Sequence, residues 1–206
     1  MVNTNRFLAF FAFLSFVLQT HAFDIYALGT SATNCKGTPI EKSFTVKLEE
    51  FLRADGLDTH VINGGINGDK PIWMVNRVES VLDKSKYPNV RLVIFEPGPN
   101  DRNPRTNREY SEKVLAKLEA AHMPTVYASP WTGGIQTEEV GNEIANAYNA
   151  YYYGPWSKGV PDNDPEWRQF DYVTPWGGHM TAKGCERVAQ QMAILIKKII
   201  LELNLQ

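Results

Sequence analysis

The 206-residue chain lacks the features that mark nucleic-acid-binding or disordered proteins. Its 21 basic and 23 acidic side chains leave a net charge of -2, and no block of five like charges occurs. Because a nucleic-acid backbone is bound through a basic surface, we expect no nucleic-acid partner. The chain also has no internal repeat and no low-complexity tract, and 43% of it is hydrophobic, which predicts one globular domain.

Long apolar runs are equally scarce. The uncharged run near the N-terminus, residues 7–18, would span about 18 Å as a helix, whereas the hydrocarbon core of a bilayer is roughly 30 Å thick. Arg6 precedes this run and the small residue Ala22 ends the segment after it, which is typical of a secretory signal peptide. We therefore expect residues 1–22 to be cleaved and residues 23–206 to form a secreted or periplasmic domain without a membrane span. An uncleaved tether is the alternative.

Motifs for metals and cofactors are also missing. The sequence contains no Cys-x-x-Cys, no His-Glu-x-x-His and no Gly-x-x-x-x-Gly-Lys-Ser/Thr, so it supports neither a metal site nor a phosphate-binding loop. The turn formed by Gly64, Gly65 and Gly68 lacks the Gly-x-Gly start of a dinucleotide fingerprint. We expect no cofactor.

The sequence does contain a regular alternation of strand-like and helix-like segments. Strands are predicted at residues 23–28, 59–62, 92–95 and 125–129, and helices at residues 44–52, from 71, at 109–121, at 140–151 and at about 181–203. Repeated units of this kind predict an α/β fold, a three-layer α/β/α sandwich with a mostly parallel central sheet. Ligands of such sheets bind beyond the carboxyl ends of the strands, so we expect the site residues in those loops.

These loops contain the groups needed for acyl transfer. Ser31, Gly68 and Asn100 follow the first three predicted strands, and His179 precedes the last helix. A serine hydroxyl becomes a good nucleophile when an imidazole accepts its proton. The resulting oxyanion needs preorganised donors, for which the Ser31 N–H, the Gly68 N–H and the Asn100 amide are the candidates. The sequence therefore predicts a nucleophile, a base and an oxyanion hole.

Each of these residues also has a purely structural interpretation. Taken alone, Ser31 is more commonly a helix N-cap, His179 can cap the final helix, and Asn100 with Asp101 can form an Asx-type turn. The segment before His179 is unusually aromatic, and we expect its rings to pack in the core, with stacking on a sugar ring or acyl chain as the alternative. These aromatic residues are Tyr151, Tyr152, Tyr153, Trp156, Trp167 and Trp176.

Taken together, four blocks resemble the SGNH hydrolase superfamily, the GDSL-type esterases and lipases. They stand here as Gly29-Thr30-Ser31, Gly68, Gly98-Pro99-Asn100-Asp101 and His179, and the resemblance spans residues 23 to about 200. It implies a flavodoxin-like fold and a Ser-His acyl-enzyme mechanism without a cofactor. The implied substrate is a small-molecule or carbohydrate ester, such as an acetylated carbohydrate, a lysophospholipid or a short-chain ester. The oligomeric state stays open.

The sequence departs from the family pattern at two positions. Thr30 stands where the family has Asp before the serine, a change expected to alter loop hydrogen bonding more than chemistry. Trp176 stands three residues before His179, where the family has the Asp that orients the histidine. We expect a backbone carbonyl or the nearby Asp171 to orient His179, and a Ser31–His179 dyad is the working model. A catalytically inactive saccharide- or lipid-binding module on the same fold is the alternative function.

The two cysteines lie close in sequence to the two predicted catalytic residues. Cys35 follows Ser31 by four residues, and Cys185 follows His179 by six. Contact between Ser31 and His179 would place the cysteines on neighbouring elements, and an oxidising compartment would permit one disulfide. We predict a Cys35–Cys185 disulfide, with two buried free thiols as the alternative.

Overall fold

The structure is a computed structural model that describes residues 23–130, 135–170 and 178–205. The expected signal peptide, residues 1–22, lies outside the described residues, as do Asp171 and Trp176. None of the helices in the described ranges combines the length and the apolar character that a bilayer crossing needs.

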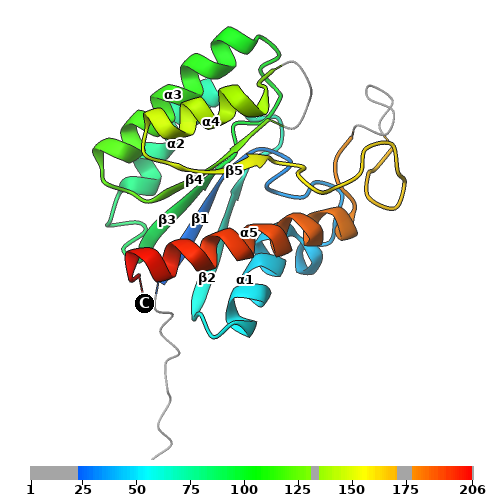
Figure 1. Cartoon of the computed structure of the whole chain (residues 1–206), viewed down its shortest axis with the longest axis horizontal. Helices are drawn as coiled ribbons and strands as arrows, with labels where there is room; N and C mark the ends of the chain where they lie inside the picture. The colour runs from blue at the N-terminus through cyan, green and yellow to red at the C-terminus, as the bar shows by residue number, and fades with distance from the viewer. Residues whose placement is uncertain (1–22, 131–134, 171–177, 206) are drawn as a thin grey trace, which may run out of the picture.

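Five parallel strands form the central sheet shown in Figure 1. They are β1 Phe23–Gly29, β2 Thr59–Gly65, β3 Val90–Phe95, β4 Thr125–Ser129 and β5 Tyr151–Pro155. Their spatial order is β2-β1-β3-β4-β5, and every neighbouring pair is parallel. In this doubly wound order the strand sequence reverses at β1, so the crevice beyond the carboxyl ends of β1 and β3 is where such folds bind ligands.

Helices cover both faces of the sheet. They are α1 Phe44–Ala54, α2 Pro71–Leu82, α3 Pro104–Ala120, α4 Glu138–Ala147 and α5 Ala182–Leu203, with a 3-10 turn, η1, at Ile40–Lys42. Figure 1 shows α1 and α5 on one face and α2, α3 and α4 on the other, and the two buried cores divide in the same way. The predicted three-layer sandwich is therefore confirmed.

The strand β1 shows how the sequence produces two cores. Successive side chains of a strand point to opposite faces. Ile25 and Ala27 accordingly pack in the core under α1 and α5, whereas Tyr26 and Leu28 pack under α2 and α3. Because both faces are covered, the strand is almost continuously apolar, as expected for a parallel sheet.

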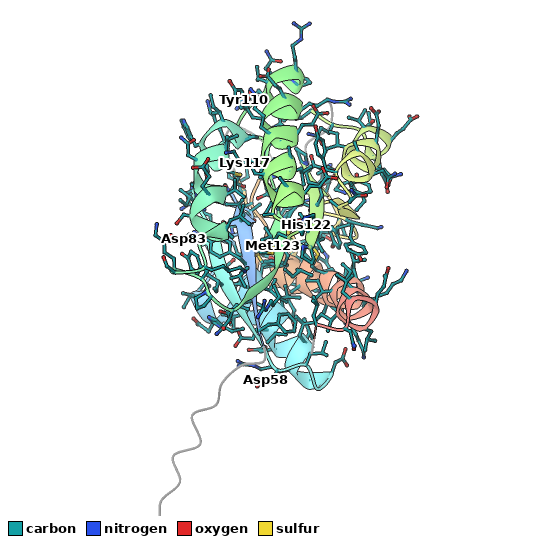
Figure 2. The ribbon with its side chains drawn as sticks, turned by 90° about the vertical axis from the view of Figure 1, so that its left-hand side faces the viewer. Asp58, Asp83, Tyr110, Lys117, His122 and Met123 are labelled. Carbon is teal, nitrogen blue, oxygen red and sulfur yellow. A yellow bond between two sulfur atoms is a disulfide. The ribbon has the colours of Figure 1, made fainter. Side chains whose placement is uncertain are left out.

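Figure 2 shows the molecule turned so that α3, one of the helices on the second face, lies nearest the viewer. Tyr110 and Lys117 lie along α3, and His122 and Met123 follow just after its C-terminal end. Met123 is buried in the core on this side of the sheet, while His122 adopts a left-handed φ of 51° and is exposed. This end of α3 leads into the N-terminus of β4, away from the carboxyl ends of the strands.

The sequence prediction is wrong at residues 148–151. The helical spacing of Val140, Ile144 and Tyr148 predicts a helix that extends to Tyr151, but α4 ends at Ala147. Asn149 has a left-handed φ of 51°, which stops the helix, and Tyr151 begins β5. The pairing of β5 with β4 supplies the hydrogen bonds that a longer helix would have supplied, and this pairing is invisible in a local pattern.

The aromatic residues at the end of the sheet pack in the core, as predicted. Tyr153 and Trp156 are buried, and the Trp156 ring packs edge-on against Phe44 with a centroid distance of 4.7 Å. They belong to the core under α1 and α5. These two rings therefore position β5 against the helix layer and are not available for stacking on a substrate.

Candidate active site

The loops that follow β1, β2 and β3 converge at the crevice where the strand order reverses. The Ile66 N–H donates to the Gly29 oxygen at 3.0 Å, and the Glu96 N–H donates to the Leu28 oxygen at 2.9 Å. The loops after β2 and β3 are therefore both hydrogen-bonded, at their first residues, to the end of β1. The candidate site residues that follow these strands are placed along one edge of the sheet.

Ser31 and His179 meet at this edge although 148 residues separate them in sequence. The Nε2 atom of His179 lies 2.8 Å from the Oγ atom of Ser31, which is a hydrogen-bond distance. Ser31 is only 5% exposed, so little water surrounds its hydroxyl group. This is the geometry in which an imidazole accepts the proton of a nucleophilic serine.

The structural alternatives for Ser31 and His179 do not hold. Ser31 lies in a series of turns, and the first α-helix after it begins only at Phe44, with Ser43 as the N-cap. The last helix is capped by Thr181, whose hydroxyl accepts from the Gly184 N–H, and not by His179. The Nδ1 atom of His179 is the atom that an orienting acceptor would bind, and both sequence positions considered for that acid lie outside the described residues.

Gln169 joins the segment around His179 to the loop at residues 30–37, which contains Ser31 and is called the nucleophile loop below. Its backbone N–H donates to the His179 oxygen at 2.7 Å, and its side-chain amide donates to the Lys36 oxygen at 2.8 Å and to the Met180 oxygen at 2.6 Å. One residue thus fixes the backbone on both sides of the site. Sequence reasoning missed Gln169, because no local pattern distinguishes a glutamine that reaches across to a loop 133 residues away.

A disulfide makes the same connection covalently. Cys35 and Cys185 are bonded, with their Cα atoms 6.3 Å apart, and this confirms the prediction made from their positions beside Ser31 and His179. Cys35 adopts a left-handed φ of 50° in the nucleophile loop, and Cys185 lies in the first turn of α5. The bond therefore fixes the loop after Ser31 to the helix after His179.

Removal of this disulfide is expected to lower stability strongly. The bond closes a loop of 150 residues, and the loop-entropy model gives about 5 kcal/mol for that length, above the roughly 2–4 kcal/mol usually measured. We expect the Cys35→Ala/Cys185→Ala variant to lose about 3 kcal/mol of unfolding free energy in urea titrations. Wild-type protein unfolded with a reductant is the matched control, and it should unfold like the variant. Equal stability of oxidised and reduced protein would contradict the prediction.

The two oxyanion-hole candidates lie on the neighbouring loops. Gly68 has a φ of 80°, a left-handed conformation that favours glycine. The Asn100 side-chain nitrogen donates to the Asp69 oxygen at 2.8 Å, and an amide nitrogen carries a second hydrogen that can serve a ligand. The Asx-type turn expected here belongs to Asp101, whose carboxylate accepts from the Asn103 N–H at 3.1 Å. Asn100 itself connects the third loop to the second.

Arg77 ties the ends of two strands to the second loop. From α2, its guanidinium forms an ion pair with the Asp69 carboxylate and donates to the Gly64 oxygen and, at 3.4 Å, to the Gly29 oxygen. Asp69 is almost fully buried, and its backbone oxygen accepts from Asn100. Arg77 therefore supports the backbone around Gly68 indirectly. Helical spacing alone gives no signal for this role.

Glu96 is the most unusual side chain near the site. It follows β3 and is completely buried, and its Oε2 atom accepts from the Thr30 N–H at 2.9 Å, from the Thr30 hydroxyl at 2.8 Å and from the Thr33 hydroxyl at 3.0 Å. Burial raises its pKa to about 7, although the bonds from Thr30 and Thr33 act in the opposite direction. Sequence reasoning missed Glu96, although an acid directly after the apolar strand Val90–Phe95 was a signal worth testing.

The raised pKa of Glu96 predicts a pH-dependent stability. Between its ordinary value of 4.5 and about 7, the folded protein binds a proton that the unfolded chain releases. The corresponding stabilisation is complete below pH 4.5 and is lost as the pH rises through 7, by about 3 kcal/mol at 1.36 kcal/mol per pKa unit. Urea unfolding of wild type and Glu96→Gln at several pH values should show this loss only in wild type. Parallel pH profiles would contradict it.

No protein-family model matches the chain, and no curated protein matches its sequence. Solved structures do match. The psychrotrophic esterase EstA from Pseudoalteromonas sp. gives a TM-score of 0.70 at 20% identity, over 86% of this chain and 98% of EstA. AlinE4, an SGNH-hydrolase family esterase, gives 0.63 at 25% identity, over 86% and 96%. The lipase/acylhydrolase from Enterococcus faecalis gives 0.67 at 19% identity, over 85% and 96%.

These likenesses extend over nearly the whole length of the matched proteins. At such low identities they establish the fold. The match to AlinE4, an SGNH-hydrolase family esterase, agrees with the resemblance that the four sequence blocks predict. The contact of Ser31 with His179 is an observation on this chain and stands independently of the comparisons.

Proposed function

We propose that this protein is a serine esterase that hydrolyses a small carboxylic ester. The observation that carries the proposal is the 2.8 Å contact between the Ser31 Oγ atom and the His179 Nε2 atom at the carboxyl edge of the sheet. The similarity in fold to esterases and to a lipase/acylhydrolase supports the same reaction class. An acetylated carbohydrate, a lysophospholipid and a short-chain ester are the substrate classes that we propose to screen.

The proposed reaction has two halves. In the first, Ser31 Oγ bonds to the ester carbonyl carbon while its proton passes to His179 Nε2. Collapse of the tetrahedral intermediate breaks the bond to the alcohol oxygen, which takes the proton from His179 and leaves. In the second half, water gives a proton to His179 and its oxygen bonds to the acyl carbon. Collapse of this second tetrahedral intermediate breaks the bond to Ser31 Oγ, which takes the proton back from His179, and the acid leaves. No step needs a cofactor.

The oxyanion of each tetrahedral intermediate is the charge that the site must stabilise. We propose the Ser31 N–H, the Gly68 N–H and the Asn100 amide as its donors, because their loops converge and Asn100 is held through the Asp69 oxygen. We further propose that a backbone carbonyl or the carboxylate of Asp171 accepts from the His179 ring and orients it. Replacement of the equivalent acid in a well-studied serine protease, a different protein, lowers kcat about 10⁴-fold.

We also propose that residues 1–22 are a signal peptide and that the domain acts outside the cytoplasm. The Cys35–Cys185 disulfide supports this location, because such bonds persist in oxidising compartments. Intact-mass measurement of protein recovered from the medium or periplasm tests it. A mature chain that begins at Phe23 is expected.

The activity is tested with a fluorophosphonate, which reports an activated serine without knowledge of the substrate. Residues 23–206 are treated with the reagent, and intact mass and peptide mapping locate the adduct. We expect one adduct on Ser31, formed with loss of fluoride, and hydrolysis of p-nitrophenyl acetate by the same preparation. Protein unfolded in urea is the control and should not react. A folded protein that forms no adduct would contradict the proposal and favour an inactive binding module.

A further inference from the structure

A buried carboxyl group lies directly against the nucleophile loop and has no step in the proposed reaction. Glu96, Thr30 and Thr33 form a cluster in which the Thr30 N–H, the Thr30 hydroxyl and the Thr33 hydroxyl each donate to the Glu96 Oε2 atom, at 2.9, 2.8 and 3.0 Å. Within the described part of the chain, the Glu96 Oε1 atom has no hydrogen-bond partner. An acid buried so completely costs stability, so the arrangement calls for an explanation.

The cluster holds the backbone on both sides of Ser31. The Thr30 N–H binds Glu96 directly, and the Thr30 hydroxyl that donates to Glu96 accepts from the Ala32 N–H at 3.3 Å. The Ser31 N–H lies between these two and has no backbone acceptor among the described residues. Because peptide groups are planar, fixing the neighbouring amides limits the rotation of the Ser31 N–H.

Two glycines make room for this cluster. A Cβ atom on Gly29 would lie 2.0 Å from the Thr33 hydroxyl oxygen and 2.9 Å from the Glu96 Oε2 atom. A Cβ atom on Gly98 would lie 2.3 Å from the Thr30 methyl carbon and 3.0 Å from the Glu96 Oε1 atom. Both positions belong to the blocks that flank the proposed site. Glycine at positions 29 and 98 therefore leaves the space that the Glu96 carboxyl group and the two threonines occupy.

We propose that Glu96, acting through Thr30, is a positioning residue that directs the Ser31 N–H toward the oxyanion. The inference rests on the proposed esterase mechanism, which gives that N–H its role. It also accounts for threonine in place of the family's usual Asp at position 30. A threonine donates its hydroxyl to Glu96, whereas an ionised carboxylate only accepts hydrogen bonds.

A carboxyl group suits this task better than its isosteres. Above pH 7, where the group is ionised, one of its oxygens accepts all three donors and no hydrogen on the side chain needs an acceptor. A glutamine would offer the same oxygen but bury an amide that has no acceptor, and an apolar residue would leave all three donors unpaired. The positioning therefore depends on an acid at position 96.

Two threonines that bind the same oxygen provide a matched test. Thr30→Val and Thr33→Val each remove one hydroxyl donor from Glu96, but only Thr30→Val also removes the acceptor of the Ala32 N–H. Thr30→Ser retains the hydroxyl. Each variant is assayed for kcat and KM with p-nitrophenyl acetate, for the rate of fluorophosphonate labelling, and for thermal unfolding by circular dichroism.

A positioning role predicts unequal kinetic effects at similar stability. We expect Thr30→Val to lower kcat by about 10–100-fold with little change in KM, since losing one oxyanion donor outright costs about 10²–10³-fold. Thr33→Val should lower kcat only a few-fold, and Thr30→Ser should stay within about 3-fold of wild type. Equal losses of kcat in the two valine variants would overturn the proposal, because a merely structural cluster predicts that result.

Amide hydrogen exchange separates this inference from the proposed function. Thr30→Val should speed exchange of the Ala32 amide about 10-fold or more, and Thr33→Val should leave it nearly unchanged. If wild type fails to label with the fluorophosphonate, the esterase function fails, and the exchange rates still decide whether Thr30 holds the loop. Unchanged Ala32 exchange in Thr30→Val would overturn the positioning role even if the enzyme is active.

Discussion

Ser31→Ala is expected to lower kcat for ester hydrolysis by about 10⁵-fold, to near the background rate. The variant removes the hydroxyl that His179 Nε2 contacts at 2.8 Å, and acyl transfer without a nucleophile leaves only binding and oxyanion stabilisation. The measurement is kcat with p-nitrophenyl acetate, together with intact mass after fluorophosphonate treatment. The adduct should disappear completely.

A buried serine outside the site provides the control for this variant. The Ser111 hydroxyl is fully buried in α3 and donates to the Asn107 oxygen at 2.7 Å, on the face of the sheet that α2 and α3 cover. Ser111→Ala should keep kcat within about 2-fold while losing about 1 kcal/mol of stability. An adduct that persists in Ser31→Ala would place the nucleophile elsewhere. Unchanged hydrolysis in that variant would refute the proposed mechanism.

His179→Ala is expected to lower kcat by about 10⁴-fold or more and to slow fluorophosphonate labelling to a similar extent. Without the imidazole, no base lies within hydrogen-bond distance of the Ser31 hydroxyl to accept its proton among the described residues. Ester binding does not require that proton transfer, so KM should change much less than kcat. The labelling rate and the two kinetic constants are measured on the same preparation.

His122→Ala is the matched control for the base. His122 is exposed, follows α3 and lies away from the carboxyl ends of the strands (Figure 2), so kcat should stay within about 2-fold of wild type. If His179→Ala retained the labelling rate of wild type, the 2.8 Å contact would have no catalytic meaning. Asp171→Asn, tested beside it, should lower kcat with little effect on KM if Asp171 orients the imidazole.

The alternative function makes a clear contrast with these results. An inactive saccharide- or lipid-binding module would show no hydrolysis and no adduct in wild type, and neither Ser31→Ala nor His179→Ala would change the affinity for its ligand by more than a few-fold. That function was considered because Trp176 stands three residues before His179, where the SGNH hydrolases that the sequence resembles have an Asp. The 2.8 Å contact between Ser31 Oγ and His179 Nε2 is the observation that favours the esterase function over this alternative.

The sequence by itself determined the fold class and the main pair of the candidate site. Apolar runs of strand length alternate with helical patterns, and such units form parallel sheets whose carboxyl ends meet at one edge. Ser31 and His179 were therefore expected to meet, and the disulfide between Cys35 and Cys185 followed from their positions next to this pair. These features follow from the order of strands and helices along the chain, and local sequence patterns are sufficient to predict that order.

Only the tertiary structure decided the supporting contacts. Tyr151 belongs to β5 because it pairs with β4, and Gln169 matters because it reaches Lys36 across 133 residues of sequence. Glu96 is buried because the nucleophile loop packs over the end of β3. The same loop contains Thr30 and Thr33, which donate hydrogen bonds to the Glu96 carboxylate. Burial and hydrogen-bond partners depend on what packs over a residue, and segments distant in sequence determine that packing.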